Sequence, residues 1–221
     1  MWKVGAGVAG LGAVAATGGT FLYREFAKPK THLVRDLLAA KNPEKRLIAN
    51  STDGSSDEWK KAWQLYSQAY KDNGKNPFSL ALEKPSTVDG NQNAPVEFMN
   101  KCAFFLNKEV LDEKDEDYRN VLQYCTRDTL VSDLITENGR SLIGESEGKE
   151  AWQKTWDDYK GKYSTKSNGQ DHWTLNGWDS QKSQADAPQV FKQECTKRSK
   201  SKAHTLDNKD YQDVLHWCTK S

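Results

Sequence analysis

The sequence predicts an all-α protein, in which an N-terminal transmembrane helix is followed by two tandem small helical repeats, each with one intra-repeat disulfide. Three observations predict this class. An uncharged segment opens the chain, the second part of the chain repeats the first, and the four cysteines form two pairs of equal spacing. Apolar side chains in both copies also recur at helical intervals.

The N-terminal segment carries no charge from Val4 to Tyr23. Basic residues flank it at Lys3, Arg24, Lys28 and Lys30. An apolar stretch of about 20 residues with basic flanks is typical of a transmembrane helix. We therefore interpret residues 1–23 as a membrane anchor that contacts the membrane through residues 4–23, followed by a basic juxtamembrane linker at residues 24–32.

Two other interpretations of the N-terminus stay open. A cleaved secretory signal fits Lys3 and the A-x-A-like site at Ala13-Val14-Ala15. Residues 5–10 (GAGVAG) also match the G-x-G-x-x-G fingerprint of dinucleotide-binding folds, in which the glycines let a pyrophosphate approach a helix N-terminus. The context argues against that fold, because only four residues precede Gly5 to form a strand and Gly18-Gly19 interrupts the helix that should follow.

An internal duplication accounts for most of the remaining chain. A shift of 93 residues superimposes the aromatic segment 59–70 on residues 152–163, and it superimposes the cysteines as well. The matching aromatic residues are Trp59 with Trp152, Trp63 with Trp156, Tyr66 with Tyr159 and Tyr70 with Tyr163. Since both copies keep them, we predict that they form the scaffold. Repeat 1 is predicted over residues 31–127 and repeat 2 over residues 128–221.

Three helices are predicted in each repeat. In repeat 1 the first helix begins at a cap on Ser56 or Asp57, and the second follows Ala94-Pro95. The third runs from about Asp115 to Thr126, with an acidic first turn that the helix dipole favours.

The segments between the first two helices of each copy are predicted to be long, variable loops. They cover residues 73–93 and 166–186 and are rich in Gly, Asn, Ser and Gln. Only Leu82 and Leu175 match in the alignment of these two segments.

All four cysteines lie in the repeats, and the separation of Cys102 from Cys125 equals that of Cys195 from Cys218. Each pair brackets two consecutive helices, so an antiparallel helical hairpin brings the two sulfur atoms together. We predict one disulfide within each pair. Such bonds persist in an oxidising compartment, which places the repeats outside the cytosol.

The charge balance argues against nucleic acid as a partner. The formal net charge is +1 with 29% charged residues, so no large single-sign field attracts a polyanion. One local run is a candidate anion-binding set: Lys197, Arg198, Lys200 and Lys202. Repeat 1 carries the largely apolar segment Phe104 to Glu109 in its place, so the copies keep their scaffold while their surfaces differ.

No metal site, cofactor or catalytic constellation is predicted. His204 and His216 would complete a Cys2His2 set with the cysteines of repeat 2, but repeat 1 keeps both cysteines and has Leu111 and Gln123 at the histidine positions. His172 has no recognisable partner in the sequence. The chain also lacks the G-x-S-x-G, P-loop and H-E-x-x-H motifs.

The layout of the chain resembles a known group of proteins. The apolar span VGAGVAGLGAVAATGG, the length just over 200 residues, the Trp-x3-Trp segments and the paired cysteines that end in YCT and WCT are similar to paralogous families of short uncharacterised membrane-anchored proteins of haemotropic mycoplasmas. The resemblance implies an outward-facing protein of a wall-less blood parasite that contributes to host-cell contact or antigenic variation. It brings no catalytic or binding residues with it.

The expected function is that of a membrane-anchored surface protein without catalysis, which displays antigens or binds a host-cell surface protein or glycan. Its expected location is the cell membrane, with a single pass and extracellular repeats. Two other classes stay open: an envelope enzyme, including the dinucleotide-binding oxidoreductase of residues 5–10, and a purely structural envelope component.

Overall fold

The computed structural model describes residues 30–71, 74–82 and 90–220. The predicted anchor at residues 1–23 and the glycine motif at residues 5–10 lie outside these ranges, and so does most of the linker at residues 24–32. Within the described ranges, no helix is both long and apolar enough to cross a membrane. Both repeats belong to one compact unit that begins at Thr31.

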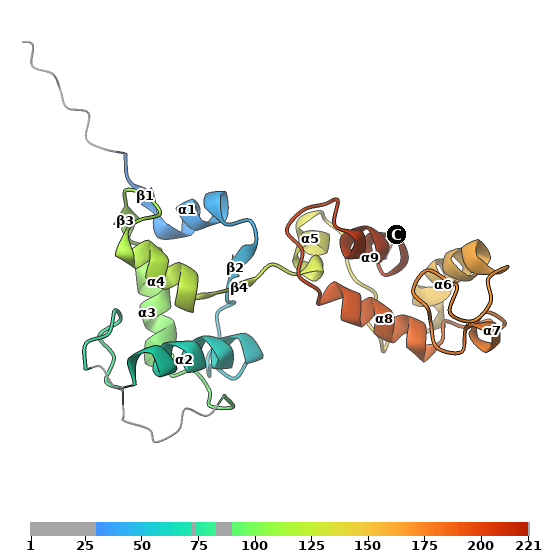
Figure 1. Ribbon diagram of the computed structural model, residues 1–221, viewed down its shortest axis with the longest axis horizontal. Helices are drawn as coiled ribbons and strands as arrows, with labels where there is room; N and C mark the ends of the chain where they lie inside the picture. Colours follow the sequence, from blue (N-terminus) through green and yellow to red (C-terminus); the bar gives the residue numbers. More distant parts are fainter. Residues whose placement is uncertain (1–29, 72–73, 83–89, 221) are drawn as a thin grey trace, which may run out of the picture. The chain divides into compact units, whose positions relative to one another are not determined.

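Repeat 1 combines helices with two short antiparallel strand pairs, coloured blue to green in Figure 1. Its elements are β1 (His32–Leu33), α1 (Val34–Lys41), β2 (Lys45–Leu47), α2 (Asp57–Tyr70), α3 (Val96–Leu106), β3 (Glu109–Val110), α4 (Glu116–Tyr124) and β4 (Thr126–Asp128). β1 pairs with β3, and β2 pairs with β4. The all-α prediction is therefore right for the helices and omits these strands, which are too short to show an alternating pattern.

Repeat 2 has the same order of helices with one addition, coloured yellow to red in Figure 1. Its elements are α5 (Val131–Glu137), α6 (Lys149–Tyr163), α7 (Trp178–Gln181), α8 (Gln189–Ser199) and α9 (Lys209–Trp217). Single β-bridges, Leu130 with Lys202 and Leu142 with Thr219, replace the two strand pairs. In the alignment of the copies, Leu130 matches Leu33 and Lys202 matches Glu109, while Leu142 matches Leu47 and Thr219 matches Thr126. The bridges therefore pair the same positions as the strands of repeat 1, so the two copies share one topology.

The helix starts follow from local sequence. The Ser56 side chain accepts a hydrogen bond from the backbone N–H of Trp59 and caps α2, as predicted. Asp115 caps α4 by accepting from the N–H of Asp117, and Asn208 caps α9 by accepting from the N–H of Tyr211. These three helices thus begin at side chains that satisfy otherwise unpaired backbone donors, whereas α3 and α8 begin after Pro95 and Pro188 without a side-chain cap.

Both predicted disulfides are confirmed. Cys102–Cys125 joins α3 to the end of α4, and Cys195–Cys218 joins α8 to the end of α9. The Cα–Cα distance is 5.6 Å in each. Each bond therefore closes a helical hairpin within its own repeat.

One tyrosine lies at the centre of each aromatic core. Tyr66 is fully buried, and its ring lies against the rings of Trp63, Tyr70, Phe78, Phe98 and Tyr124. Tyr159 is buried in the same way against Trp156, Tyr163, Trp173, Trp178, Phe191 and Trp217. Every ring beside Tyr66 has a counterpart beside Tyr159, and only Trp178 is extra.

Where they are described, the segments before α3 and α8 are loops as predicted, apart from α7, but both contain the same turn. Phe78 and Trp173 are buried, and their backbone N–H groups donate to the hydroxyls of Tyr66 and Tyr159, at 3.0 Å and 2.9 Å. The residue that follows each ring, Ser79 or Thr174, has a positive φ, of 52° and 51°. Both copies therefore contain the same ordered turn.

This turn also corrects the alignment of the leucines. Leu80, and not Leu82, is the counterpart of Leu175, because the N–H of Leu80 donates to Asn76 as that of Leu175 donates to Asp171. The shift that superimposes the turn is 95 residues, two more than the 93-residue shift of the helices α2 and α3 onto α6 and α8. Repeat 2 also forms α7 within the predicted loop.

The boundary between the copies lies at Thr129. β4 ends at Asp128 and pairs with β2 of repeat 1. The carbonyl of Thr129 accepts a hydrogen bond from the N–H of Ala203 in repeat 2, while its own N–H donates to the carbonyl of Glu44 in repeat 1.

Candidate binding site in the first repeat

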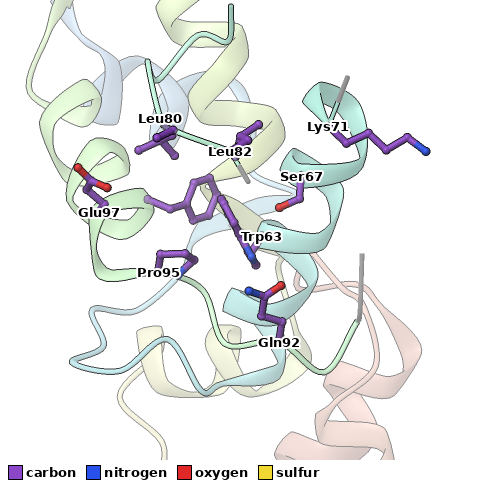
Figure 2. A pocket seen from close by; sticks show the side chains of 10 residues that line it. Trp63, Ser67, Lys71, Leu80, Leu82, Gln92, Pro95 and Glu97 are labelled. Carbon is purple, nitrogen blue, oxygen red and sulfur yellow. The ribbon is translucent and has the colours of Figure 1, made fainter. Parts of the chain in front are cut away.

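A pocket of about 280 Å³ lies beside the aromatic core of repeat 1. α2 contributes Trp63 and Ser67, and Lys71 follows its last residue. Leu80 and Leu82 come from the following loop, and Pro95 lies at the start of α3. Figure 2 shows Trp63 and Ser67 facing the pocket, with the Lys71 side chain directed away from it. Its size is close to the lower end, about 300 Å³, of the range for small-molecule sites.

Two buried polar atoms in this pocket have no hydrogen-bond partner among the described residues: Nε1 of Trp63 and Oγ of Ser67. Trp63 is 8% exposed and Ser67 is 5% exposed, so solvent reaches little of either residue. A buried polar group without a partner costs free energy, about 1–3 kcal/mol. The side chains of Trp63 and Ser67 therefore line the pocket, while their unpartnered Nε1 and Oγ atoms are themselves buried.

The equivalent place in repeat 2 is filled by the chain itself. Trp178 is fully buried, and its ring lies edge-on to Trp156 and Tyr159 at centroid distances of 6.0 Å and 5.7 Å. The Trp178 indole N–H donates to the carbonyl of Lys166 at 3.1 Å. Repeat 1 has no aromatic residue between Phe78 and Phe98, so its own sequence cannot supply such a ring.

Repeat 2 contains a polar cluster that repeat 1 lacks. Nε2 of His172 lies 2.7 Å from Oδ2 of Asp213, which also accepts from the Trp173 indole N–H at 3.1 Å. Asp213 is buried, and the His172 ring lies against the rings of Tyr163 and Trp217. The expectation that His172 has no partner is therefore wrong, because that partner lies 41 residues further along the chain.

The chemistry of this cluster is that of a fixed core network. In repeat 1 Pro77 occupies the position of His172, and Asn120 occupies the position of Asp213. Within the described part of the chain, the side-chain hydrogen bond of His172 is to Asp213. The pair orients the turn against α9.

Of the predicted anion-binding residues, Lys200 and Lys202 line the same surface pocket, while Lys197 and Arg198 are not among its lining residues. Arg198 is held by Asp210 at 2.6 Å and by Glu194 at 3.2 Å, and its guanidinium lies over the Trp173 ring. Lys197 pairs with Glu194, and Lys202 pairs with Asp128. Lys200 is exposed and lies one residue beyond α8.

The role of Arg198 is explained by the other copy. Asp117 aligns with Asp210, and in repeat 1 it pairs with Lys108 at 2.7 Å, whose ammonium lies over the Phe105 ring. Phe105 stands at the position of Arg198. Each copy thus pairs the equivalent aspartate with a cation from a different sequence position. Comparing the aligned residues one by one does not reveal this exchange of cations.

The predicted scaffold residues do come together. Trp59 and Trp63 lie against Phe98 at 6.0 Å and 5.3 Å, and Trp152 and Trp156 lie against Phe191 at 6.0 Å and 5.1 Å. Tyr70 and Tyr163 lie at the edge of each core, 5.0 Å from Tyr66 and Tyr159.

Burial governs the acidity of the central tyrosines. It raises the pKa of Tyr66 to about 12, although the hydrogen bond from the Phe78 N–H acts in the opposite direction. Burial also raises the pKa of Tyr159, and the nearby Asp171 carboxylate adds to this. Both hydroxyls therefore stay protonated and can donate to Asn76 and Asp171 at neutral pH.

Comparisons with protein-family models, with curated proteins and with solved structures find no match for this chain.

Proposed function

We propose that the chain is a membrane-anchored surface protein whose two repeats form a non-catalytic interaction module for a host-cell surface protein or glycan. The observation that carries the proposal is the contrast between the copies. They keep the same disulfide, the same central tyrosine and the same turn, while their exposed and pocket-lining residues differ. Such divergence on a fixed frame is typical of proteins that present different binding faces.

Two further observations support a membrane-anchored protein with its repeats at the cell surface. Residues 4–23 have the length and basic flanks of a membrane anchor. Each repeat contains a disulfide, and such bonds are rare in reducing compartments. The basic residues on both sides of the apolar span do not set its orientation, so the topology has to be measured.

Proteolysis of intact cells that carry the protein tests the proposal. Externally added trypsin should cut the juxtamembrane linker at residues 24–32 and release the repeats, because Arg24 and Lys30 lie there and neither is followed by proline. A cytosolic protein of the same cells serves as the control for membrane integrity. Repeats that resist trypsin on intact cells and are released by it only after lysis would contradict display at the surface.

A further inference from the structure

A groove of about 370 Å³ on repeat 2 brings together basic side chains from three parts of the chain. Its lining residues are Arg140, which follows α5, Lys154 on α6, and Gln212, Leu215 and His216 on α9. None of these five residues is acidic. We name this site the basic groove, because its lining side chains carry only positive charge.

Arg140 is the fixed cation of the basic groove. It is partly buried, and its Nε atom is shielded from solvent. Within the described residues, its side-chain hydrogen bond runs from Nη2 to Oγ1 of Thr219, at 3.1 Å. Thr219 is neutral, so this bond positions the guanidinium without neutralising its charge.

Lys154 and His216 add two mobile donors. Lys154 pairs with Asp158 at 3.2 Å, but its side chain is 73% exposed, and an ion pair so exposed contributes little free energy. The ammonium of Lys154 is therefore available to a ligand. His216 is exposed, and its ring has an N–H that donates a hydrogen bond. Donors from three segments suit an anion with three free oxygen atoms, such as a sulfate ester.

Repeat 1 has an equivalent groove in which acidic residues balance the charge. Four residues that line its larger pocket, of about 950 Å³, align with the basic groove: Lys45 with Arg140, Lys61 with Lys154, Leu122 with Leu215 and Gln123 with His216. The acidic residues that line it are Asp57, Glu58 and Asp128.

Two of these acidic positions differ in repeat 2. Asp128 pairs with Lys45 at 2.7 Å. Ala151 stands at the position of Glu58, and Ser221 stands at the position of Asp128. Both cations of the groove thus recur in the two copies, while the side-chain carboxylates at these two positions belong to repeat 1 alone.

The remaining lining residues favour a sugar as the carrier of the anion. Gln212 donates its amide N–H to the carbonyl of Leu206, which leaves its Oε1 to accept from a hydroxyl. Leu215 gives the groove an apolar surface for the C–H groups of a sugar ring. The volume of about 370 Å³ lies within the range of small-molecule sites.

We propose that the basic groove of repeat 2 binds a sulfate ester of a glycan. Arg140, Lys154 and His216 donate to the sulfate oxygens, and Gln212 accepts from a neighbouring sugar hydroxyl. This assignment rests on the proposed role of the repeats as an interaction module and names the chemistry that one face of the module recognises.

The probes are lactose with a sulfate ester on its galactose, unmodified lactose and inorganic sulfate, each added to the full chain labelled with nitrogen-15 in a nonionic detergent. The Nε–H of Arg140 is buried and so exchanges slowly with water, which makes its NMR signal a reporter of the guanidinium. Sulfated lactose should shift this signal saturably, and lactose should leave it in place. Inorganic sulfate should bind about fivefold more weakly than sulfated lactose, because it lacks the sugar hydroxyl that donates to Gln212.

Three variants locate the binding. Arg140→Gln removes the fixed charge and should weaken binding of sulfated lactose about tenfold or more. Ala151→Glu installs the carboxylate that repeat 1 carries at Glu58, and Lys154→Gln removes the exposed cation; each should weaken binding about threefold.

The matched control for Lys154→Gln is Lys197→Gln. Lys197 is 75% exposed and pairs with Glu194 on its own helix at 3.1 Å, but it does not line the basic groove. Its replacement should leave the affinity for sulfated lactose unchanged.

Three results would overturn the proposal. One is the absence of a saturable shift of the Arg140 signal with sulfated lactose, and another is equal weakening by Lys154→Gln and Lys197→Gln. The third is equal affinity for inorganic sulfate and for sulfated lactose, which would mean that the groove takes a free ion. The trypsin experiment is independent of all three, so failure of the groove assignment and failure of surface display can be told apart.

Discussion

At the scale of single residues, Tyr66 and Tyr159 hold the turn of their copy against the central helix. Each lies on the central helix and joins it to the following turn, because its hydroxyl accepts from a backbone N–H and donates to Asn76 or Asp171. The turn residue Ser79 or Thr174 has a positive φ, which non-glycine residues adopt at a cost. The tyrosine hydroxyl is part of what holds the turn in that conformation.

Removing the hydroxyl of Tyr159 should therefore destabilise repeat 2. Tyr159→Phe leaves the buried N–H of Trp173 without an acceptor, and we expect the free energy of unfolding to fall by about 1–3 kcal/mol in chemical denaturation. Tyr163→Phe, one helical turn further on, is the matched control. Its hydroxyl makes no hydrogen bond within the described residues, so a loss as large as that of Tyr159→Phe would contradict this role.

Alkaline pH should separate the buried tyrosines from exposed ones. Because burial raises the pKa of Tyr66 to about 12, its neutral form stabilises the fold fully below about pH 10. That contribution is lost as the pH rises through about 12. An ultraviolet titration with parallel circular dichroism should show late tyrosine ionisation together with loss of helix. Ionisation of every tyrosine near pH 10 with the helices intact would contradict the assigned burial.

At the scale of elements, three helices of each repeat could be predicted from sequence, but α1, α5, α7 and the turn were not. The period of Trp59, Trp63 and Tyr66 and the Ser56 cap identify α2 directly. The turn was missed because a length difference of two residues shifts its alignment, and α7 is too short to show a period. The pocket had one signal in the sequence, the lack of an aromatic residue between Phe78 and Phe98, which becomes meaningful once Trp178 is seen in the core.

Removing the Trp178 ring tests whether its site in repeat 2 is equivalent to the pocket of repeat 1. Trp178→Ala should lower the free energy of unfolding of repeat 2 by about 3–5 kcal/mol, as truncation of a buried tryptophan does. Added indole should then restore part of the melting temperature by binding the new cavity. Trp178→Phe keeps a ring and should lose less. An alanine variant that keeps its free energy of unfolding, and whose melting temperature does not change when indole is added, would show that Trp178 does not fill such a site.

At the scale of the whole molecule, the chain carries two copies that each complete their own core. The buried residues fall into one cluster within residues 34–125 and another within residues 131–218. Each cluster includes its own disulfide. We infer that damage to one core leaves the other folded.

Loss of one disulfide should therefore act on one repeat. Cys125→Ser should destabilise repeat 1 by about 2–5 kcal/mol, the usual cost of removing a native disulfide from a small domain. The unfolding transition of repeat 2, followed by hydrogen exchange of its backbone amides, should be almost unchanged. Equal loss of protection in both copies would mean that they fold as one cooperative unit.

The most direct test of the central claim, two separately closed copies in an oxidising compartment, is disulfide mapping. The protein is isolated from its cells with thiol trapping and digested without reduction, and its linked peptides are identified by mass spectrometry. The account predicts Cys102 linked to Cys125 and Cys195 linked to Cys218, with no trapped thiol. Free cysteines, or Cys102 linked to Cys195, would contradict it.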